Sequence, residues 1–291
     1  MHMNVLNFGI LKKQEYIGAS KAIFDSLSAE GVPYTNDLVK AAVDNFMRYL
    51  RDNSLMSGIE YFYGNLTDLV SGSNADRLKQ MKYNWVNPLN TDAAFRRTWP
   101  AGVTATVYGL EYDGISQYAR TYFIPSASGI ITQNKTMVAD YYQSMGSGIF
   151  RFDSGALDGA GRGLMNGPRY GNHAAYGQWN VNDIGDQPTG GGTSGLCIAY
   201  RVVNTQYRVR QNGSDLTFAN RASLGLPTVE MYQGCNNNNG TPTGFVPHRH
   251  FANCVASFTL AQIQLFEIGV NTLQEEIEIA LSLTSGSRKK F

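Results

Sequence analysis

Two histidines separated by one residue, His248 and His250, are the first candidates for chemistry in this chain of 291 residues. Residues i and i+2 of an extended segment point to the same side, so both imidazoles could face one metal ion, with Cys254 as a third ligand. A zinc site needs a fourth ligand or a water, and no further ligand follows at a recognisable spacing. The sequence therefore predicts an exposed loop with two histidines, and neither a metal ion nor a cofactor.

Glu111 and Asp113 are the candidate pair for hydrolysis of a glycosidic bond. Alternate residues of a strand share a face, and glycosidases use two carboxylates on either side of the scissile bond. The sandwich glucanases place a further glutamate shortly after such a pair, but Ile115 and Ser116 stand there in this chain. The pattern favours a strand end followed by a turn aspartate, and it predicts that the protein is not an enzyme.

Other kinds of catalysis lack their usual motifs. The glycine-rich residues 159–163 resemble a fragment of a phosphate-binding loop, but no parallel strand precedes them and no Lys-Ser or Lys-Thr pair follows. No serine occupies a Gly-x-Ser-x-Gly elbow, and no cysteine has a convincing partner histidine. We therefore expect neither nucleotide binding nor nucleophilic catalysis.

Aromatic side chains between glycines form the candidate ligand-binding surface. Residues 146–195 contain 14 of the chain's 31 glycines, a density that predicts long loops at the ends of strands. Tyr170, Tyr176 and Trp179 lie in these loops, and Asn237 lies in a second polar loop, residues 236–240. The rings could contact a sugar or anchor the loops to the core, and we favour anchoring. For the asparagines we favour a turn over a binding role.

The composition limits the partners. The chain has 24 basic and 23 acidic residues, so its net charge of +1 gives no reason to expect binding to nucleic acid or to an anionic membrane. No apolar run approaches the roughly 20 residues of a membrane span, and the first residues do not resemble a signal peptide. Three cysteines without Cys-x-x-Cys spacing predict buried thiols and no disulfide framework. We expect synthesis in a cytoplasm without export by the signal-peptide route.

Residues 195–235 determine the predicted fold. Apolar and polar residues alternate along 196–201 and 207–210, which is typical of strands with one buried face. Asn212-Gly213 between two such runs predicts a tight hairpin. Further strands are expected at 59–63, 83–86, 104–112, 118–124, 137–142, 149–152 and 229–234, with a helical turn at 66–70. Successive strands without helical crossovers indicate an all-β, antiparallel sandwich.

Two amphipathic helices are predicted to pack on this sandwich. The first runs from Thr35 to about Asp52, and the second begins at a Thr259–Gln262 capping box and ends near Ser282. Gly269 inside the second helix indicates a bend or a close contact with another backbone, and the apolar seam also suits a helical partner, either residues 39–50 or a symmetry mate. Residues 1–34 are too weakly patterned to form a core, so they either pack on another surface or fray.

Several segments of the chain, taken together in their order along the sequence, resemble the concanavalin-like, laminin-G-like jelly-roll proteins encoded by phages and prophages of Bacteroidetes. The resemblance covers most of residues 34–285 and is carried by residues 34–50, 53–55, 64–67, 110–118, 207–216 and 232–240 and by the helix from Thr259. The chain departs from that family at Leu281-Ser282-Leu283 and in its basic tail, Arg288-Lys289-Lys290, and no calcium ligand set can be carried over.

The resemblance implies a non-enzymatic virion protein, a head or tail fibre or decoration component made in a bacterial host. It further implies a homo-oligomer, with a trimer favoured, that is joined to other virion proteins and displays its jelly roll to the host surface. We expect an attachment segment (1–34), a helix with short strands packing on the sandwich (35–105), the jelly roll (106–258), and a C-terminal helix with a basic tail (259–291). A carbohydrate-binding module or lectin-like adhesin that recognises host glycans is the alternative, and a sandwich-fold glycoside hydrolase is a weaker one.

Overall fold

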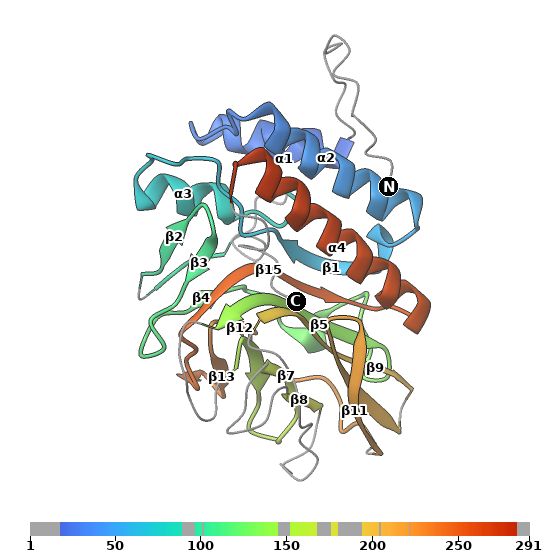
Figure 1. Ribbon diagram of the computed structural model, residues 1–291. Coiled ribbons are helices and arrows are strands. Elements are labelled where there is room, and N and C mark those ends of the chain that lie inside the picture. Colours follow the sequence, from blue (N-terminus) through green and yellow to red (C-terminus); the bar gives the residue numbers. More distant parts are fainter. Residues whose placement is uncertain are drawn as a thin grey trace.

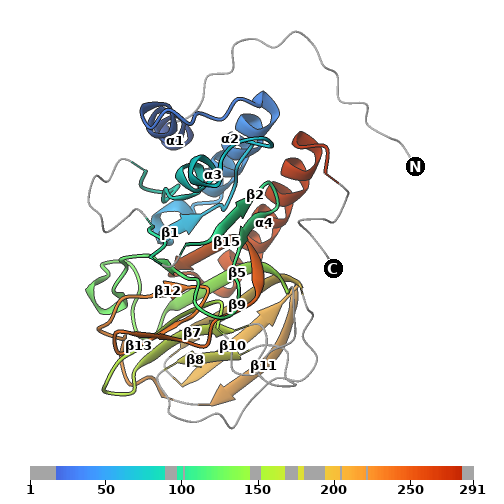
Figure 2. The same ribbon diagram turned by 90° about the vertical axis from the view of Figure 1, so that its left-hand side faces the viewer.

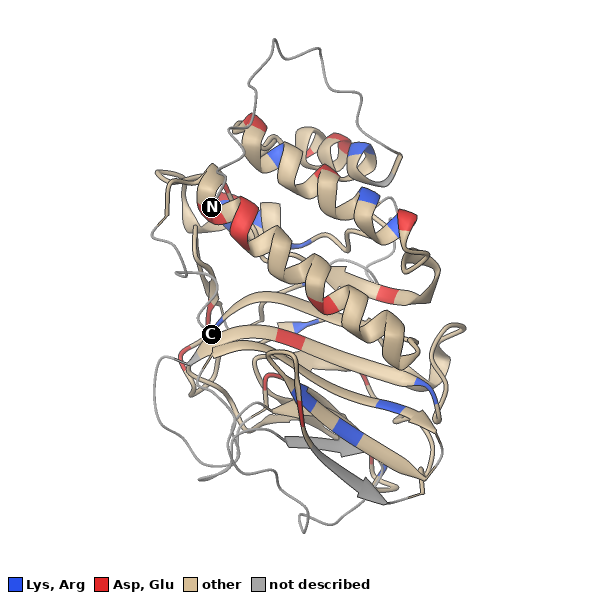
Figure 3. Cartoon of the chain, turned by 45° about the vertical axis from the view of Figure 1, so that its right-hand side comes forward, with Lys and Arg blue, Asp and Glu red and all other residues tan. Residues whose placement is uncertain are grey.

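The chain folds into three layers, in which helices cover one face of a large β-sheet and a smaller sheet covers the other face (Figures 1 and 2). This computed structural model describes residues 18–88, 97–100, 102–144, 152–167, 176–179, 194–203, 205–220 and 222–283. The two facing sheets agree with the predicted β-sandwich. The two predicted helices, one before and one after the strands in the sequence, are also present. Charges of both signs are spread over the helices and strands (Figure 3).

Within the described residues, the larger sheet has eight strands in the order β11-β10-β9-β5-β15-β3-β2, with β1 also paired to β15. The strands are β1 (Ile59–Tyr63), β2 (Thr104–Thr106), β3 (Gly109–Glu111), β5 (Thr136–Ser144), β9 (Ser194–Val203), β10 (Gln206–Gln211), β11 (Ser214–Asn220) and β15 (His248–Ala256). The predicted hairpin is confirmed between β10 and β11, because Asn212 and Gly213 both have positive φ angles, 50° and 84°.

The prediction of one strand over residues 104–112 is wrong, because the chain turns back on itself there. β2 and β3 pair with each other as a short hairpin, and β3 also pairs with β15. Gly109 makes this possible. Its φ is 124°, and a Cβ at this position would lie 2.4 Å from the carbonyl oxygen of His250.

The smaller sheet has seven strands among the described residues, in the order β14-β13-β6-β12-β4, with β7 pairing β6 and β8. They are β4 (Ala119–Arg120), β6 (Ser154–Leu157), β7 (Gly163–Gly167), β8 (Tyr176–Trp179), β12 (Tyr232–Gln233), β13 (Asn236–Asn238) and β14 (Thr241–Thr243). Its pairings are antiparallel except that β13 runs parallel to β6, which the sequence did not predict.

The prediction that the glycine-rich residues 146–195 form long loops is wrong for β6, β7 and β8. Some of the glycines permit close strand packing instead, since a Cβ at Gly155 would lie 2.6 Å from Asn236 Oδ1 of the neighbouring strand. The predicted strand at 118–124 shrinks to β4, because Tyr122 has a φ of 58° and leaves the extended conformation. Residues 145–151, which include most of the predicted strand at 149–152, lie outside the described residues.

The chain alternates between the two sheets, and the sandwich core lies between them. β4 belongs to the smaller sheet, β5 to the larger, β6–β8 to the smaller, β9–β11 to the larger, β12–β14 to the smaller and β15 to the larger. The core includes Tyr61, Tyr142, Leu164, Val209 and Met231. Strands distant in sequence therefore become neighbours, and the sheets bury their shared face by the hydrophobic effect.

The helical layer consists mainly of α1 (Gly18–Ala29), α2 (Asp37–Asp52) and α4 (Leu260–Ala280). Both predicted helix starts are confirmed: Asn36 Oδ1 accepts from the amides of Leu38 and Val39, and Thr259 and Gln262 form the capping box. α2 packs on α4, which is the intrachain helix partner that the apolar seam suggested. None of the helices described is long and apolar enough to cross a membrane.

Two further helices were not predicted. α1 packs on α2 through buried Ile23 and Leu27, and its Ser20 hydroxyl donates to the buried carboxylate of Asp44, so residues 18–34 pack on their own chain. α3 (Asn74–Met81) begins at the N-cap Ser73, whereas the helical turn at 66–70 and the strand at 83–86 do not form. The 3-10 turns Met56–Gly58 and Pro125–Ala127 complete the described helices.

Gly269 lies where α4 packs tightly against α2. A Cβ there would lie 2.6 Å from Cε1 of Tyr49, whose hydroxyl donates a hydrogen bond to the carbonyl of Leu265 at 2.8 Å. We expect Gly269→Ala to lower the free energy of unfolding by about 1–2 kcal/mol, because the clash outweighs the roughly 1 kcal/mol gain in helix propensity.

Urea unfolding followed by circular dichroism measures this loss. Ile279→Ala in the same helix is the control, because that side chain is 74% exposed and should change the free energy by no more than about 0.5 kcal/mol. A Gly269→Ala variant more stable than the wild type would contradict the close contact.

Candidate functional site

A cluster of polar side chains lies between the two sheets, where a sandwich usually places apolar groups. We call it the inter-sheet cluster, and its members share an exposure of 2% or less: Asp140, Asp153, Ser154, Asn166, His248, His250 and Asn253. They come from β5, β6, β7, β15 and the residue preceding β6. Because burying charge and unpaired polar groups is costly, so dense a cluster requires mutual pairing or a ligand.

β15 places its histidines and Cys254 on opposite faces. His248 and His250 are alternate residues of the strand, and both point toward the smaller sheet. A register shift between His250 and Ala252 then brings the side chain of Asn253 to the same side. Cys254 belongs to the core beneath the helices and is not a ligand partner of the histidines. The prediction of an exposed loop is therefore wrong, although both histidines do face one side. All three cysteines are buried and free, as expected.

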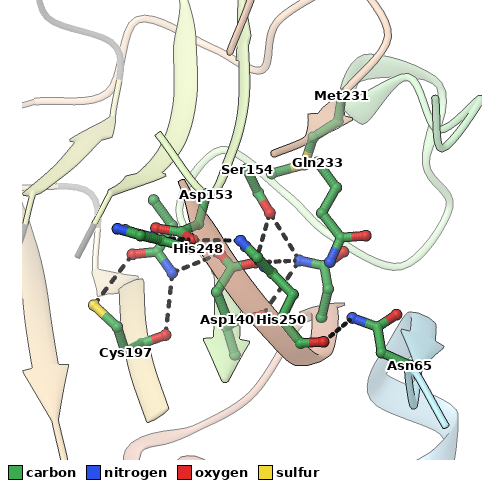
Figure 4. A network of polar contacts seen from close by, with 12 residues as sticks. Asn65, Asp140, Asp153, Ser154, Cys197, Met231, Gln233, His248 and His250 are labelled. Atoms are coloured by element: carbon green, nitrogen blue, oxygen red, sulfur yellow. Dashed lines mark hydrogen bonds and ion pairs between the residues drawn. The ribbon is translucent and has the colours of Figure 1, made fainter. Parts of the chain in front are cut away.

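Asp153 holds both imidazoles (Figure 4). One of its oxygens, Oδ1, lies 2.9 Å from His248 Nδ1 and 2.5 Å from His250 Nε2. The other ring nitrogen of His250 faces Asp140, at 3.9 Å from Oδ1. The two histidines thus converge on one carboxylate, with a second carboxylate behind them.

Asp140 organises the neutral members of the cluster (Figure 4). Its carboxylate accepts hydrogen bonds from Ser154 Oγ at 2.7 Å, Asn166 Nδ2 at 2.8 Å and Asn253 Nδ2 at 2.8 Å. Asn166 also donates to the carbonyl of Cys197 at 3.1 Å. Three strands other than its own therefore meet at the Asp140 side chain.

The two carboxyls differ in acidity. Burial raises the pKa of Asp153, but the two imidazoles outweigh burial and lower this pKa to about 2. Burial and the nearby charge of Asp153 together raise the pKa of Asp140 to about 7. Asp153 is therefore the fixed negative charge of the cluster, and Asp140 takes up a proton far more readily.

Several buried atoms of the inter-sheet cluster have no hydrogen-bond partner in the protein: Asp153 Oδ2, His250 Nδ1 and Asn253 Oδ1. Nearby, Arg97 is also buried and donates to the side-chain oxygens of Gln233 and of Asn65, the latter at 2.6 Å. The two unpartnered oxygens of the cluster, on Asp153 and Asn253, are therefore able to accept hydrogen bonds or to coordinate a cation.

Glu111 and Asp113, the acid pair considered for hydrolysis, are each held by other groups of the protein. Glu111 is bound to Arg249, with 2.6 Å between Oε1 and the guanidinium. Asp113 Oδ1 accepts from the backbone amides of residues 115, 116 and 117 at 2.8, 2.9 and 3.0 Å. As the sequence indicated, Asp113 is a turn residue that follows the end of a strand.

The predicted binding residues are not assembled as expected. Tyr170 lies outside the described residues, while Tyr176 and Trp179 are the end residues of β8, opposite Gly167 and Leu164, and not in a loop. Asn237 is 2% exposed on β13: its Nδ2 donates to the Glu230 carbonyl at 2.6 Å and its Oδ1 accepts from Gly240 N at 2.7 Å.

Both polar ends of the Asn237 side chain therefore bind the protein itself, and its role as a ligand contact stays a prediction. The turn that the sequence favours for the asparagines is formed by Asn239 and Gly240, which have φ angles of 49° and 95° and connect β13 to β14. Asn236 and Asn237 are buried, so the segment predicted as a polar loop begins inside the smaller sheet.

A group of aromatic side chains lies on the outer side of β4 and β12. We call Tyr118, Tyr122, Tyr232 and Phe245 the aromatic patch. The Tyr118 ring centroid lies 4.9 Å from that of Tyr232 and 6.2 Å from that of Phe245. On the same strands, Ala119 and Gln233 are buried and face inward, so the rings stand on the opposite side.

An ion pair fixes the polar part of the patch. Arg120 Nη2 lies 2.6 Å from Glu230 Oε2, and the guanidinium carbon lies 4.7 Å from the centroid of the Tyr122 ring. Glu230 Oε1 accepts from the amide of Tyr122 at 2.7 Å, which holds that residue at its φ of 58°. The alternation of Tyr118, Arg120 and Tyr122 was visible in the sequence and was missed because these residues were assigned only to a strand.

Comparison with known proteins identifies no family. No family model matches this chain, and no curated protein does. Among solved structures, Trypanosoma rangeli sialidase is 11% identical with a TM-score of 0.47, and the match covers 80% of this chain but 39% of the sialidase.

Two carbohydrate-binding structures are also similar. Domain 4 of AbnA, an arabinanase of Geobacillus stearothermophilus, is 10% identical over 61% of this chain and 91% of its own, with a TM-score of 0.40. The CBM40 of a Ruminococcus gnavus sialidase is 11% identical over 47% and 82%, with a TM-score of 0.38. With TM-scores below 0.5, these likenesses carry no argument about this protein.

Proposed function

We propose that this protein is a non-catalytic β-sandwich that binds a carbohydrate at the aromatic patch on its smaller sheet. The observation that carries the proposal is that two partly exposed rings of the patch, Tyr118 and Tyr122, lie beside an ordered ion pair. The faces of sugar rings carry C–H groups that pack against aromatic rings, while their hydroxyls need hydrogen-bond donors and acceptors nearby. Tyr118 and Tyr122 supply the rings, and Arg120 and Glu230 supply the polar groups.

The patch is also preorganised. Tyr122 occupies the left-handed region of backbone conformation, which costs a residue with a side chain roughly 1 kcal/mol or more. Its amide is held by Glu230, and its hydroxyl lies 2.9 Å from Thr98 Oγ1. A strained residue held from two sides keeps its ring in place before a ligand arrives, which lowers the entropic cost of binding.

The inter-sheet cluster favours a binding role over catalysis, because its titratable groups are enclosed. Asp140, Asp153 and His250 have no exposed surface, and His248 is 2% exposed, so a polysaccharide cannot reach them without opening the sandwich. An active site needs its acid and base within hydrogen-bonding reach of the substrate. These groups are therefore better explained by structure than by turnover.

A glycan array followed by calorimetry on the best ligand tests the proposal. We expect the wild type to bind, and Tyr118→Ala to weaken binding about tenfold or more, because one stacking ring is worth about 1.4 kcal/mol. Tyr108→Ala is the control, since Tyr108 is also a partly exposed tyrosine, under the guanidinium of Arg249 at 5.0 Å, but lies in the β2–β3 turn of the other sheet.

Two results would contradict carbohydrate binding at this patch. The first is that the wild type binds no glycan on the array. The second is that Tyr118→Ala and Tyr108→Ala lose affinity equally, which would place the binding surface elsewhere or indicate a general loss of structure. Circular dichroism of each variant distinguishes loss of structure from loss of contact.

Within the sandwich class, we further propose the concanavalin-like jelly roll, supported by the way the chain alternates between the two sheets. The virion location, the trimer and attachment through residues 1–34 stay predictions from the resemblance. A glycan-binding surface on the smaller sheet is compatible with display on a particle, because the helical layer lies on the opposite side of the molecule (Figure 2).

A further inference from the structure

The geometry points to a second site, independent of the carbohydrate proposal: we propose that Asp153, His248 and His250 bind a divalent transition-metal ion, zinc by their chemistry, inside the sandwich. Each residue offers a ligand atom, and these atoms all lie within 4.8 Å of one another. Two imidazole nitrogens and a carboxylate oxygen are three of the four ligands that a zinc ion takes, and the second oxygen of Asp153 is available for the fourth position.

The local fold makes the three ligands converge. His248 and His250 are alternate residues of β15 and point to one side, while Asp153 is fixed immediately before β6 of the other sheet. The Asp153 amide donates to the Asn166 carbonyl at 2.9 Å, and its carbonyl accepts from Gly234 N at 2.7 Å. Each ligand is thus placed by regular strand pairing, and an ion bound there would join the two sheets.

An independent observation is the set of buried atoms that no protein group satisfies. Asp153 is fully enclosed, and its Oδ2 has no hydrogen bond from the protein. This oxygen is therefore free to coordinate an ion. Asn253 Oδ1, in the same cluster, is a second unpartnered oxygen. Leaving a buried carboxylate oxygen unsatisfied costs about 1–3 kcal/mol or more, and a bound cation removes that cost.

Asp140 has the position of a residue that supports a metal ligand. The Nε2 of His250 faces Asp153 and its Nδ1 faces Asp140, at 3.9 Å. A histidine that binds a metal through one nitrogen usually presents the other to a carboxylate, which fixes the ring and increases its basicity. Asp140 itself is held by Ser154, Asn166 and Asn253, so this support is rigid.

The proposed ion is structural. The side chains of the site are enclosed between the sheets, so a substrate has no access, and the ion would enter as the sandwich closes. Binding to the folded state alone stabilises it by mass action. Its role would be to hold β15 and the start of β6 at a fixed separation, in place of a disulfide across the sandwich.

Metal analysis of the full chain tests the site. Protein unfolded in denaturant with EDTA is refolded with or without zinc, and the metal content is measured after desalting. We expect about one zinc per chain, and a melting temperature about 5 °C or more above that of the metal-free protein. Refolding with cobalt should give a visible absorption spectrum typical of tetrahedral coordination.

Variants separate this site from other zinc ligands. His250→Gln and Asp153→Asn should lose the metal, whereas Cys254→Ala, which removes the ligand suggested by sequence alone, should keep it. A double variant of the chain's other histidines, His2→Ala and His173→Ala, should also keep it. The proposal is overturned if the wild type refolded with zinc carries less than about 0.1 ion per chain, or if the double variant loses the ion. The wild-type measurement decides the question even if a variant fails to fold.

Discussion

Replacing Asp140 by alanine is expected to lower the free energy of unfolding by about 3–5 kcal/mol, one of the two largest losses that we predict for a single substitution. The carboxylate accepts from Ser154, Asn166 and Asn253 at 2.7–2.8 Å, and these donors come from β6, β7 and β15. Each would lose a strong, charge-assisted acceptor in a place where water cannot replace it, since all four residues are at most 1% exposed.

Denaturant unfolding of metal-free protein measures this loss, so that a bound ion does not contribute. Asp140→Asn should cost clearly less than Asp140→Ala, because the amide oxygen still accepts hydrogen bonds. Asp25→Ala is the surface control: Asp25 pairs with Lys21 at the helix surface, its side chain is 59% exposed, and we expect a change of no more than about 0.5 kcal/mol. If Asp140→Ala and Asp25→Ala are equally mild, the cluster is not a centre of stability.

The features that the sequence predicted correctly are those fixed by neighbours along the chain. The β10–β11 hairpin follows from Asn212-Gly213, because this pair accepts positive φ angles, and α4 begins where Thr259 and Gln262 satisfy each other's backbone groups. Such signals depend on residues within four positions of each other, so no tertiary information is needed to read them.

The inter-sheet cluster could not be predicted in this way. His250 and Asp140 are separated by 110 positions, and their meeting depends on β5 pairing with β15 and on the register shift after His250. Without knowledge of that pairing, two histidines separated by one residue are as typical of an exposed loop as of a buried strand, and the sequence analysis favoured the loop. The asparagine and serine members gave no signal, because such residues are common in turns.

Glycine misled the prediction for a related reason. A run rich in glycine indicates loops where the chain uses the ability of glycine to adopt positive φ angles. At Gly155 the chain instead uses the absence of a Cβ, since a neighbouring strand occupies the space that a Cβ would fill. The sequence does not distinguish these two uses. The aromatic patch was missed in the same way, because the positive φ of Tyr122 depends on Glu230, 108 positions later.

Gly64→Ala is the second substitution expected to have a large effect, a loss of about 3 kcal/mol or more in the free energy of unfolding. A Cβ at Gly64 would lie 2.1 Å from Cζ2 and 2.3 Å from Cη2 of Trp85. The indole is 2% exposed, with its ring centroid 5.3 Å from that of Phe62 and 6.3 Å from that of Phe46. The ring cannot move away without opening the core beneath α2.

Thermal and urea unfolding, with tryptophan fluorescence to report the displacement of the indole, measure this effect. Gly129→Ala is the matched control, because Gly129 is exposed and an added Cβ there would meet nothing within 4 Å. Trp85→Leu removes the ring that collides, so Gly64→Ala should cost at least about 1 kcal/mol less in that background than in the wild type. Equal costs in both backgrounds would show that the strain comes from the backbone at Gly64 and not from contact with the indole.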